Sequence, residues 1–129
     1  MPCRRRWRCS ATDSLIRSVF LDHLDGDEDM VTMNLGDNVN TPEKIEVFRR
    51  SFPAMLAAVR AKCPDARVVV MGCWYGTPER YEIITSACAV NGVEFLSFAG
   101  MPTLATRSHP SDAGFKLIAD RFIAEILRL

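Results

Sequence analysis

The chain has 129 residues, a length that suits a single domain with its own hydrophobic core. Hydrophobic residues make up 48% of it, charged residues 25%, and the formal net charge is zero, which is ordinary for a soluble globular protein. No apolar run approaches the roughly 18 residues that a membrane-spanning helix needs, so we expect no membrane partner.

The positive charge is concentrated at the start of the chain. Four of the first eight residues are arginines, and without them 12 basic residues stand against 16 acidic ones. No hydrophobic stretch follows, so the start does not have the form of a signal peptide and we expect a cytoplasmic protein. Residues 1–12 are predicted to be a disordered basic tip, and residues 13–129 a single domain. No basic stripe supports nucleic-acid binding elsewhere, and we expect no such partner.

The cysteines and histidines do not form a metal-binding pattern. There are five cysteines, with no C-x-x-C pair and no Cys/His spacing typical of a metal site. Cys63 and Cys88 fall in apolar runs or at helix ends, where we expect reduced, packed thiols. His23 and His109 have no partners at ligand spacing, so we expect no metal and no cofactor.

The first predicted element is a helix over Ser14–Leu24, where apolar residues recur with a helical period. The acidic segment 25–29 ends it. This segment is too short for a calcium loop and lacks the EF-hand spacing, so we interpret it as a solvated turn. Residues 30–35 then predict a short strand, which runs into a loop at Gly36.

Two Thr-Pro-Glu sequences, at Thr41 and Thr77, predict helix starts. Threonine is a preferred N-cap residue, proline is favoured at the first helical position, and a glutamate in the first turn interacts favourably with the positive end of the helix dipole. Residues 67–72 are apolar on both faces, as buried parallel strands are. Residues 93–98 predict another strand, and Ser111 caps a final helix. The predicted core stripe of that helix is Phe115, Ile118, Phe122 and Ile126.

Helices and strands therefore alternate with short connections, which favours a parallel sheet covered by helices on both faces. In such sheets the functional site lies at the carboxyl ends of the strands. The loops 36–40, 72–76 and 100–110 are all predicted to lie at that edge.

Two of these loops carry motifs. The chain reads Gly36-Asp37-Asn38-Val39 after the first strand and Thr106-Arg107-Ser108-His109-Pro110 before the last helix. With the helix that follows, these segments resemble the SGNH (GDSL-type) hydrolase superfamily over roughly residues 27–129. Val39 and Thr106 stand where that family has aspartates. The resemblance implies a three-layer, flavodoxin-like fold that hydrolyses carboxylic or carbohydrate esters by acyl transfer without a cofactor.

By this resemblance His109 is the general base, and Asn38, with the Gly36 N–H, supplies the oxyanion hole. Histidine titrates near neutral pH, and an uncharged N–H donor suits a developing oxyanion. The alternatives are an exposed histidine beside the helix cap and an Asx-turn asparagine. Trp74 and Tyr75 are candidates for binding an acyl or sugar group, with plain packing as the alternative.

The nucleophile is the gap in this pattern. Thr12-Asp13-Ser14-Leu15 imitates the family's Gly-Asp-Ser block, but only 22 residues separate Ser14 from Gly36, and Ser14 also suits a helix N-cap. We therefore expect a divergent or truncated member that lacks the first strand and is weakly active or inactive. The alternative is a non-catalytic α/β binding domain. A sheet without that strand exposes an edge, which predicts a homodimer or poor solubility.

Overall fold

The computed structural model describes residues 21–72, 77–98 and 110–126. The predicted alternation of helices and strands is confirmed. The elements in chain order are η1 (Leu21–His23), β1 (Met30–Asn34), α2 (Pro42–Lys62), β2 (Arg67–Met71), α3 (Pro78–Asn91), β3 (Glu94–Leu96) and α4 (Asp112–Ile126).

The three strands form one parallel sheet in the order β1-β2-β3, so each strand pairs with the next one along the chain. The register places Thr32 beside Val69, and Val70 beside Phe95. Because the strands are parallel, all three carboxyl ends lie at one edge of the sheet, where the sequence places the candidate site.

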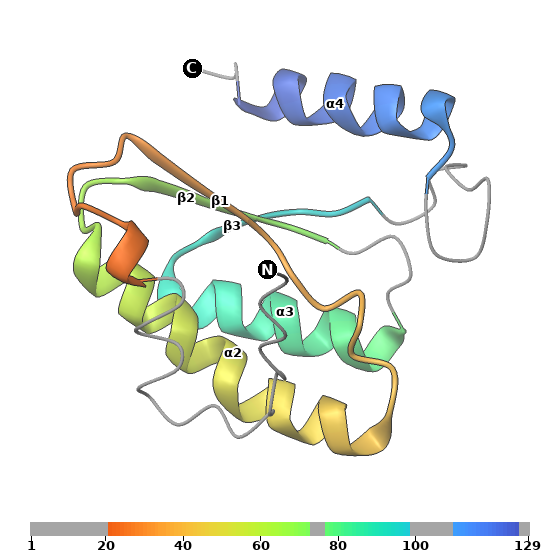
Figure 1. The fold of residues 1–129 in the computed structure, drawn as a ribbon, viewed down its shortest axis with the longest axis horizontal. Helices are drawn as coiled ribbons and strands as arrows, with labels where there is room; N and C mark the ends of the chain where they lie inside the picture. Colours follow the sequence, from red (N-terminus) through yellow and green to blue (C-terminus); the bar gives the residue numbers. More distant parts are fainter. Residues whose placement is uncertain (1–20, 73–76, 99–109, 127–129) are drawn as a thin grey trace, which may run out of the picture.

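The structure has three layers, as predicted. Helices α2 and α3 cover one face of the sheet and α4 covers the other (Figure 1). The middle strand is buried on both sides: Val68 and Val70 belong to the core beneath α2 and α3, whereas Val69 packs with residues of α4. This explains why the three central residues of β2 are all valines, whereas the edge strands carry polar residues.

The predicted helix starts are confirmed in detail. The hydroxyl of Thr41 accepts a hydrogen bond from the Lys44 N–H at 3.3 Å, and that of Thr77 accepts one from the Arg80 N–H at 3.3 Å. Ser111 accepts from a backbone N–H of α4 in the same way, at 3.1 Å. Each hydroxyl satisfies an N–H that has no partner within its helix.

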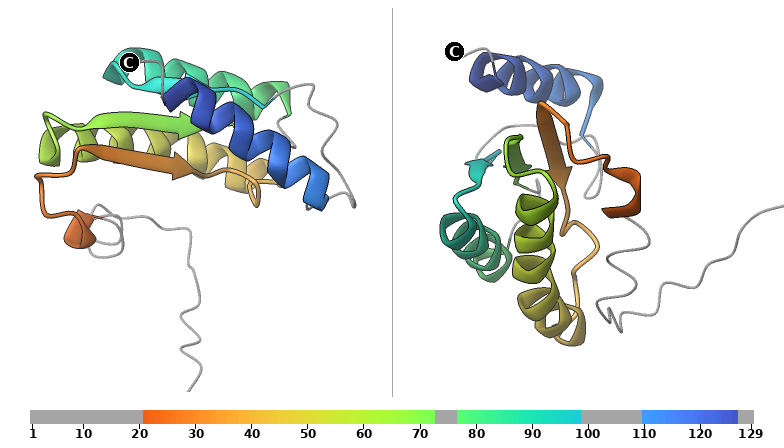
Figure 2. Two further views of the ribbon diagram at one scale, coloured as in Figure 1. Left: turned by 90° about the horizontal axis from the view of Figure 1, so that it is seen from above. Right: turned by 90° about the vertical axis from the view of Figure 1, so that its left-hand side faces the viewer.

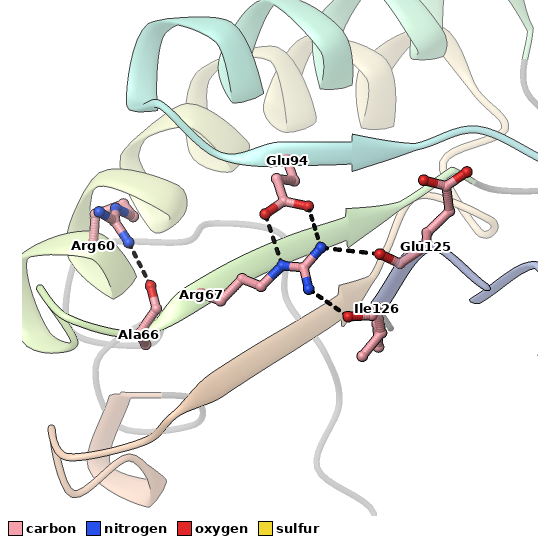
Figure 3. A network of polar contacts seen from close by, with 6 residues as sticks. All are labelled: Arg60, Ala66, Arg67, Glu94, Glu125 and Ile126. Atoms are coloured by element: carbon pink, nitrogen blue, oxygen red, sulfur yellow. Dashed lines mark hydrogen bonds and ion pairs between the residues drawn. The ribbon is translucent and has the colours of Figure 1, made fainter. Parts of the chain in front are cut away.

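Arg67 connects the carboxyl-terminal end of α4 to the sheet. Its guanidinium donates two hydrogen bonds of 2.8 Å to the carboxylate of Glu94 on β3 (Figure 3). It also donates to the carbonyls of Ile126 at 2.8 Å and Glu125 at 3.2 Å. These two carbonyls lie at the end of α4, where no N–H group of the helix can donate to them. A cation at this position also meets the negative end of the helix dipole.

Two predictions about helices are wrong in part. Of the helix expected over Ser14–Leu24, the described residues contain only a single 3-10 turn over Leu21–His23, and residues 14–20 lie outside them. Phe115 was expected in the core but is 53% exposed, because the narrow sheet contacts only part of the apolar side of α4. Ile118 and Phe122 do pack on the sheet, as predicted. Within the described part of the chain, no helix has the length and apolarity to cross a membrane.

Candidate functional site

The candidate site is the edge of the sheet where the strands end and the helices begin. Helices α2, α3 and α4 all start on this side, as Figure 1 shows, so their positive dipole ends point the same way. The segment between β1 and α2 is described throughout, and it contains two of the residues selected from the sequence, Gly36 and Asn38.

Gly36 and Asn38 belong to one tight turn. The N–H of Val39 donates to the carbonyl of Gly36 at 3.1 Å, which places Asp37 and Asn38 at the centre of a β-turn. Gly36 has a φ of +113°, a conformation that residues with a side chain rarely adopt. Glycine is therefore needed at the point where the chain leaves β1 and turns toward α2.

Arg80 anchors this turn from inside the protein. It lies on α3, is only 5% exposed, and is the one buried charged residue in the described part of the chain. Its guanidinium donates to the carbonyl of Gly36 at 2.8 Å and to that of Asp37 at 3.3 Å. Hydrogen bonds from a buried cation to carbonyl oxygens are among the stronger ones in proteins, so the turn is fixed by its inner side.

Lys44 holds the outer side of the same loop. Its ammonium donates to the carbonyl of Asn38 at 3.1 Å and to the side-chain oxygen of Asn40 at 3.0 Å. Asn38 itself is exposed, and its side-chain amide makes no hydrogen bond to another described residue. The backbone of Asn38 is thus held in place while its N–H donors face solvent at the carboxyl edge.

Sequence reasoning missed both anchoring residues. A signal for Arg80 was present: it occupies a position of α3 in line with the buried Ile83, Ile84 and Ala87, where an apolar residue is the usual choice. A charged residue in such a register indicates a buried polar contact, because an unpaired charge would be too costly there.

The other candidate residues lie outside the described residues. These are His109, Trp74, Tyr75 and Ser14, together with Thr106 and the basic tip. Gly72 and Thr77 flank the segment that contains Trp74 and Tyr75. Pro110, which follows His109, is buried and immediately precedes Ser111, the cap of α4. Gly72 after β2, Thr77 at the start of α3 and Pro110 before α4 therefore lie at the same edge as the Gly36–Asn38 turn.

A second polar cluster lies away from this edge, where β1 begins. The thiol of Cys63 donates to the carboxylate of Glu28 at 3.0 Å, and the backbone N–H groups of Asp25 and Gly26 donate to it at 2.6 and 2.9 Å. These bonds, that of Cys63 foremost, lower the pKa of Glu28 to about 2. The acidic segment is therefore a turn closed by its own glutamate.

The same cluster makes Cys63 a poor nucleophile. Burial and the neighbouring carboxylate both raise the pKa of its thiol, so the thiol stays protonated as a donor. Burial also raises the pKa of Cys88, to about 11. Both cysteines are free and buried, as predicted. His23 is exposed, and no group of three potential metal ligands occurs among the residues that the structure describes.

Comparisons of the chain with protein-family models, with curated proteins and with solved structures found no match.

Proposed function

We propose that this chain is an ester hydrolase of the SGNH type, which transfers an acyl group from a carboxylic or carbohydrate ester to water. The observation that carries the proposal is the Gly36–Asn38 turn. It presents an exposed side-chain amide at the carboxyl edge of a parallel sheet, and hydrogen bonds from the buried Arg80 hold its inner side.

The chemistry assigned to the turn is stabilisation of an oxyanion. When a nucleophile attacks an ester carbonyl, negative charge develops on its oxygen, and donors already in position stabilise that charge without reorganising. In this proposal the Asn38 amide and the Gly36 N–H are those donors. The ammonium of Lys44, bound to the Asn38 carbonyl at 3.1 Å, adds positive potential at the same edge.

Proton transfer is assigned to His109, one residue before the buried Pro110 at the start of α4. The histidine takes a proton from the attacking hydroxyl and returns it to the leaving alcohol. Ser14 is the candidate for that hydroxyl, and without an effective one the domain is weakly active or inactive. Trp74 and Tyr75 are assigned to the acyl or sugar group of the substrate.

A second candidate function is a non-catalytic binding domain that uses the same edge. Val39 favours it, because this side chain packs against the core where the family that the sequence resembles has an aspartate. A turn with such an apolar anchor still offers the Asn38 amide to a ligand, but it contributes no carboxylate to the site.

The test is labelling with a fluorophosphonate, followed by intact-mass measurement, on the wild type and on Ser14→Ala, His109→Ala and Asn38→Ala. We expect one label per chain, loss of labelling in the first two variants, and labelling slowed by about 10²-fold or more in the third. Asn40→Ala is the matched control, since Asn40 is an exposed asparagine of the same loop. A wild type that is not labelled would favour the binding-domain function instead. If the Asn40→Ala variant were labelled as slowly as the Asn38→Ala variant, Asn38 would have no specific role in the site.

A further inference from the structure

Helices α2 and α3 lie side by side against one face of the sheet (Figure 2), and a groove with a volume of about 200 Å³ runs between them. Ile83 and Ala87, which are 4% and 3% exposed, form its floor. Pro53 of α2 and the exposed Val90 of α3 form apolar walls. Because α3 begins at the edge that carries the Gly36–Asn38 turn, the groove leads away from the candidate active site.

Two polar side chains of α3 stand at the rim of this groove. Glu82 and Ser86 both line it and are both exposed. They are four residues apart, so they lie on the same side of the helix. Within the described part of the chain, neither the Glu82 carboxylate nor the Ser86 hydroxyl has a hydrogen-bond or ion-pair partner. Both groups are therefore free to accept hydrogen bonds from a ligand.

Pro53 leaves a third acceptor beside the groove. It lies inside α2 and has no N–H, so the carbonyl of Arg49, four residues earlier, lacks its usual helical donor. Arg49 and Pro53 both line the groove, which places this carbonyl on its α2 side. The Arg49 guanidinium is already engaged, because it donates to the carboxylate of Glu79 at 2.6 Å. The groove thus offers acceptors, while the cation that lines it is paired.

We propose that this groove binds an arginine side chain of a partner peptide. The aliphatic part of an arginine packs on an apolar surface while its charged head stays at the rim. Here the floor of Ile83 and Ala87 receives the aliphatic part, and the Glu82 carboxylate receives the guanidinium. A planar guanidinium can form two parallel hydrogen bonds to one carboxylate and still donate to further acceptors, which an ammonium cannot match.

The size and charge of the groove favour this occupant. Pockets for small molecules usually exceed about 300 Å³, so a volume of about 200 Å³ suits a single side chain better. The carboxylates of Glu79 and Glu82 outweigh the guanidinium of Arg49, so the local potential attracts a cation. A hydrated metal ion would gain nothing from the apolar floor, whereas the carbon chain of an arginine is covered by it.

The test is an NMR titration of the full chain, labelled with ¹⁵N, with the peptide acetyl-Gly-Arg-Gly-amide. We expect saturating shifts at the amides of Ile83, Ser86 and Ala87, with a dissociation constant of about 1 mM, because one anchored side chain supports only weak binding. The matched control peptide has citrulline, which keeps the shape of arginine without its charge, and should bind at least about fivefold more weakly. Equal binding of the two peptides, or shifts spread over acidic residues elsewhere, would overturn the proposal.

Variants of the chain test the two sides of the groove. Glu82→Gln should raise the dissociation constant about fivefold, whereas Asp65→Asn, which removes an exposed carboxylate outside the groove, should change it less than about twofold. Pro53→Ala restores a helical donor to the Arg49 carbonyl, so it should weaken binding while raising the melting temperature of the chain. Equal effects of Glu82→Gln and Asp65→Asn would show that only the net charge matters, and the proposal would fail.

A last variant separates a partner from the chain itself, which carries arginines at positions 4, 5, 6 and 8. We expect unchanged peptide binding when all four are replaced by glutamine in the full chain. If the replacement tightened binding several-fold, the chain's own start would be the occupant of the groove and the proposal of a partner peptide would be wrong.

Discussion

Arg67 and Glu94 join β2 to β3 through two parallel hydrogen bonds of 2.8 Å, and the same guanidinium binds the last carbonyls of α4. One side chain thereby connects two strands and the helix that covers the second face of the sheet. A planar guanidinium with five N–H donors can do this, whereas a lysine ammonium cannot match the bidentate geometry. The apolar contacts of α4 with the sheet are few, so this polar contact carries much of its attachment.

The first prediction follows from that contact. Arg67→Ala should lower the free energy of unfolding by about 1 to 2 kcal/mol, because it removes an ion pair and two hydrogen bonds to carbonyls in a partly exposed position. Urea unfolding measures the loss, and hydrogen exchange should increase most in α4. Arg50→Ala, which breaks an exposed ion pair on α2, is the control and should cost less than about 0.5 kcal/mol. Equal costs for the two variants would contradict the role assigned to Arg67.

The second prediction concerns acid stability. The pKa of Glu28 is about 2 in the folded chain against 4.5 as its ordinary value, so folding favours the ionised carboxylate. Its contribution is fully present above pH 4.5 and is lost as the pH falls from there toward 2. Unfolding measured across this range should therefore depend less steeply on pH in Glu28→Gln than in the wild type.

A companion variant tests the cause of that shift. Cys63→Ala removes the thiol that donates to Glu28 at 3.0 Å, so it should also flatten the pH dependence between 4.5 and 2. Slopes identical to that of the wild type in both variants would show that the Glu28–Cys63 contact does not contribute to acid stability.

The third prediction concerns the buried anchor of the turn. Arg80→Met should cost about 2 to 4 kcal/mol, because it leaves two carbonyls of the turn without the donor that holds them. Arg49→Met is the control: Arg49 is a 44% exposed arginine, paired on the surface with Glu79, and its loss should cost less than about 1 kcal/mol. Thermal unfolding of both variants gives the comparison. A cost for Arg80→Met no greater than that for Arg49→Met would mean that the turn is held by its other contacts.

Much of the fold could be predicted because its signals are local. The valines of β2 and the two Thr-Pro-Glu helix starts depend on residues a few positions apart, and the structure confirms them. The exposure of Phe115 could not be predicted in this way. Helical periodicity gives the direction of an apolar face, but the part of it that is buried depends on how wide a sheet lies beneath the helix.

Only the residues of the candidate site's turn, and not the buried residue that anchors it, could be predicted from the sequence. A glycine and an asparagine after a strand are visible in the sequence, and the structure places Gly36 and Asn38 in one turn. Arg80 is 44 residues away from Gly36 along the chain, and its contact depends on how α3 packs against the end of β1. Sequence spacing contains no information about such a contact. The roles of His109, Trp74 and Tyr75 stay predictions.

The sequential strand order has a consequence for how the chain acquires its structure. Pairing β1 with β2 joins residues 37 positions apart, as with Met30 and Arg67, and pairing β2 with β3 joins residues 25 apart, as with Val69 and Glu94. No strand has to wait for a later one to be inserted between it and its neighbour. During synthesis, β1, α2 and β2 can assemble while the rest is still being made, and α4 docks last onto a finished sheet.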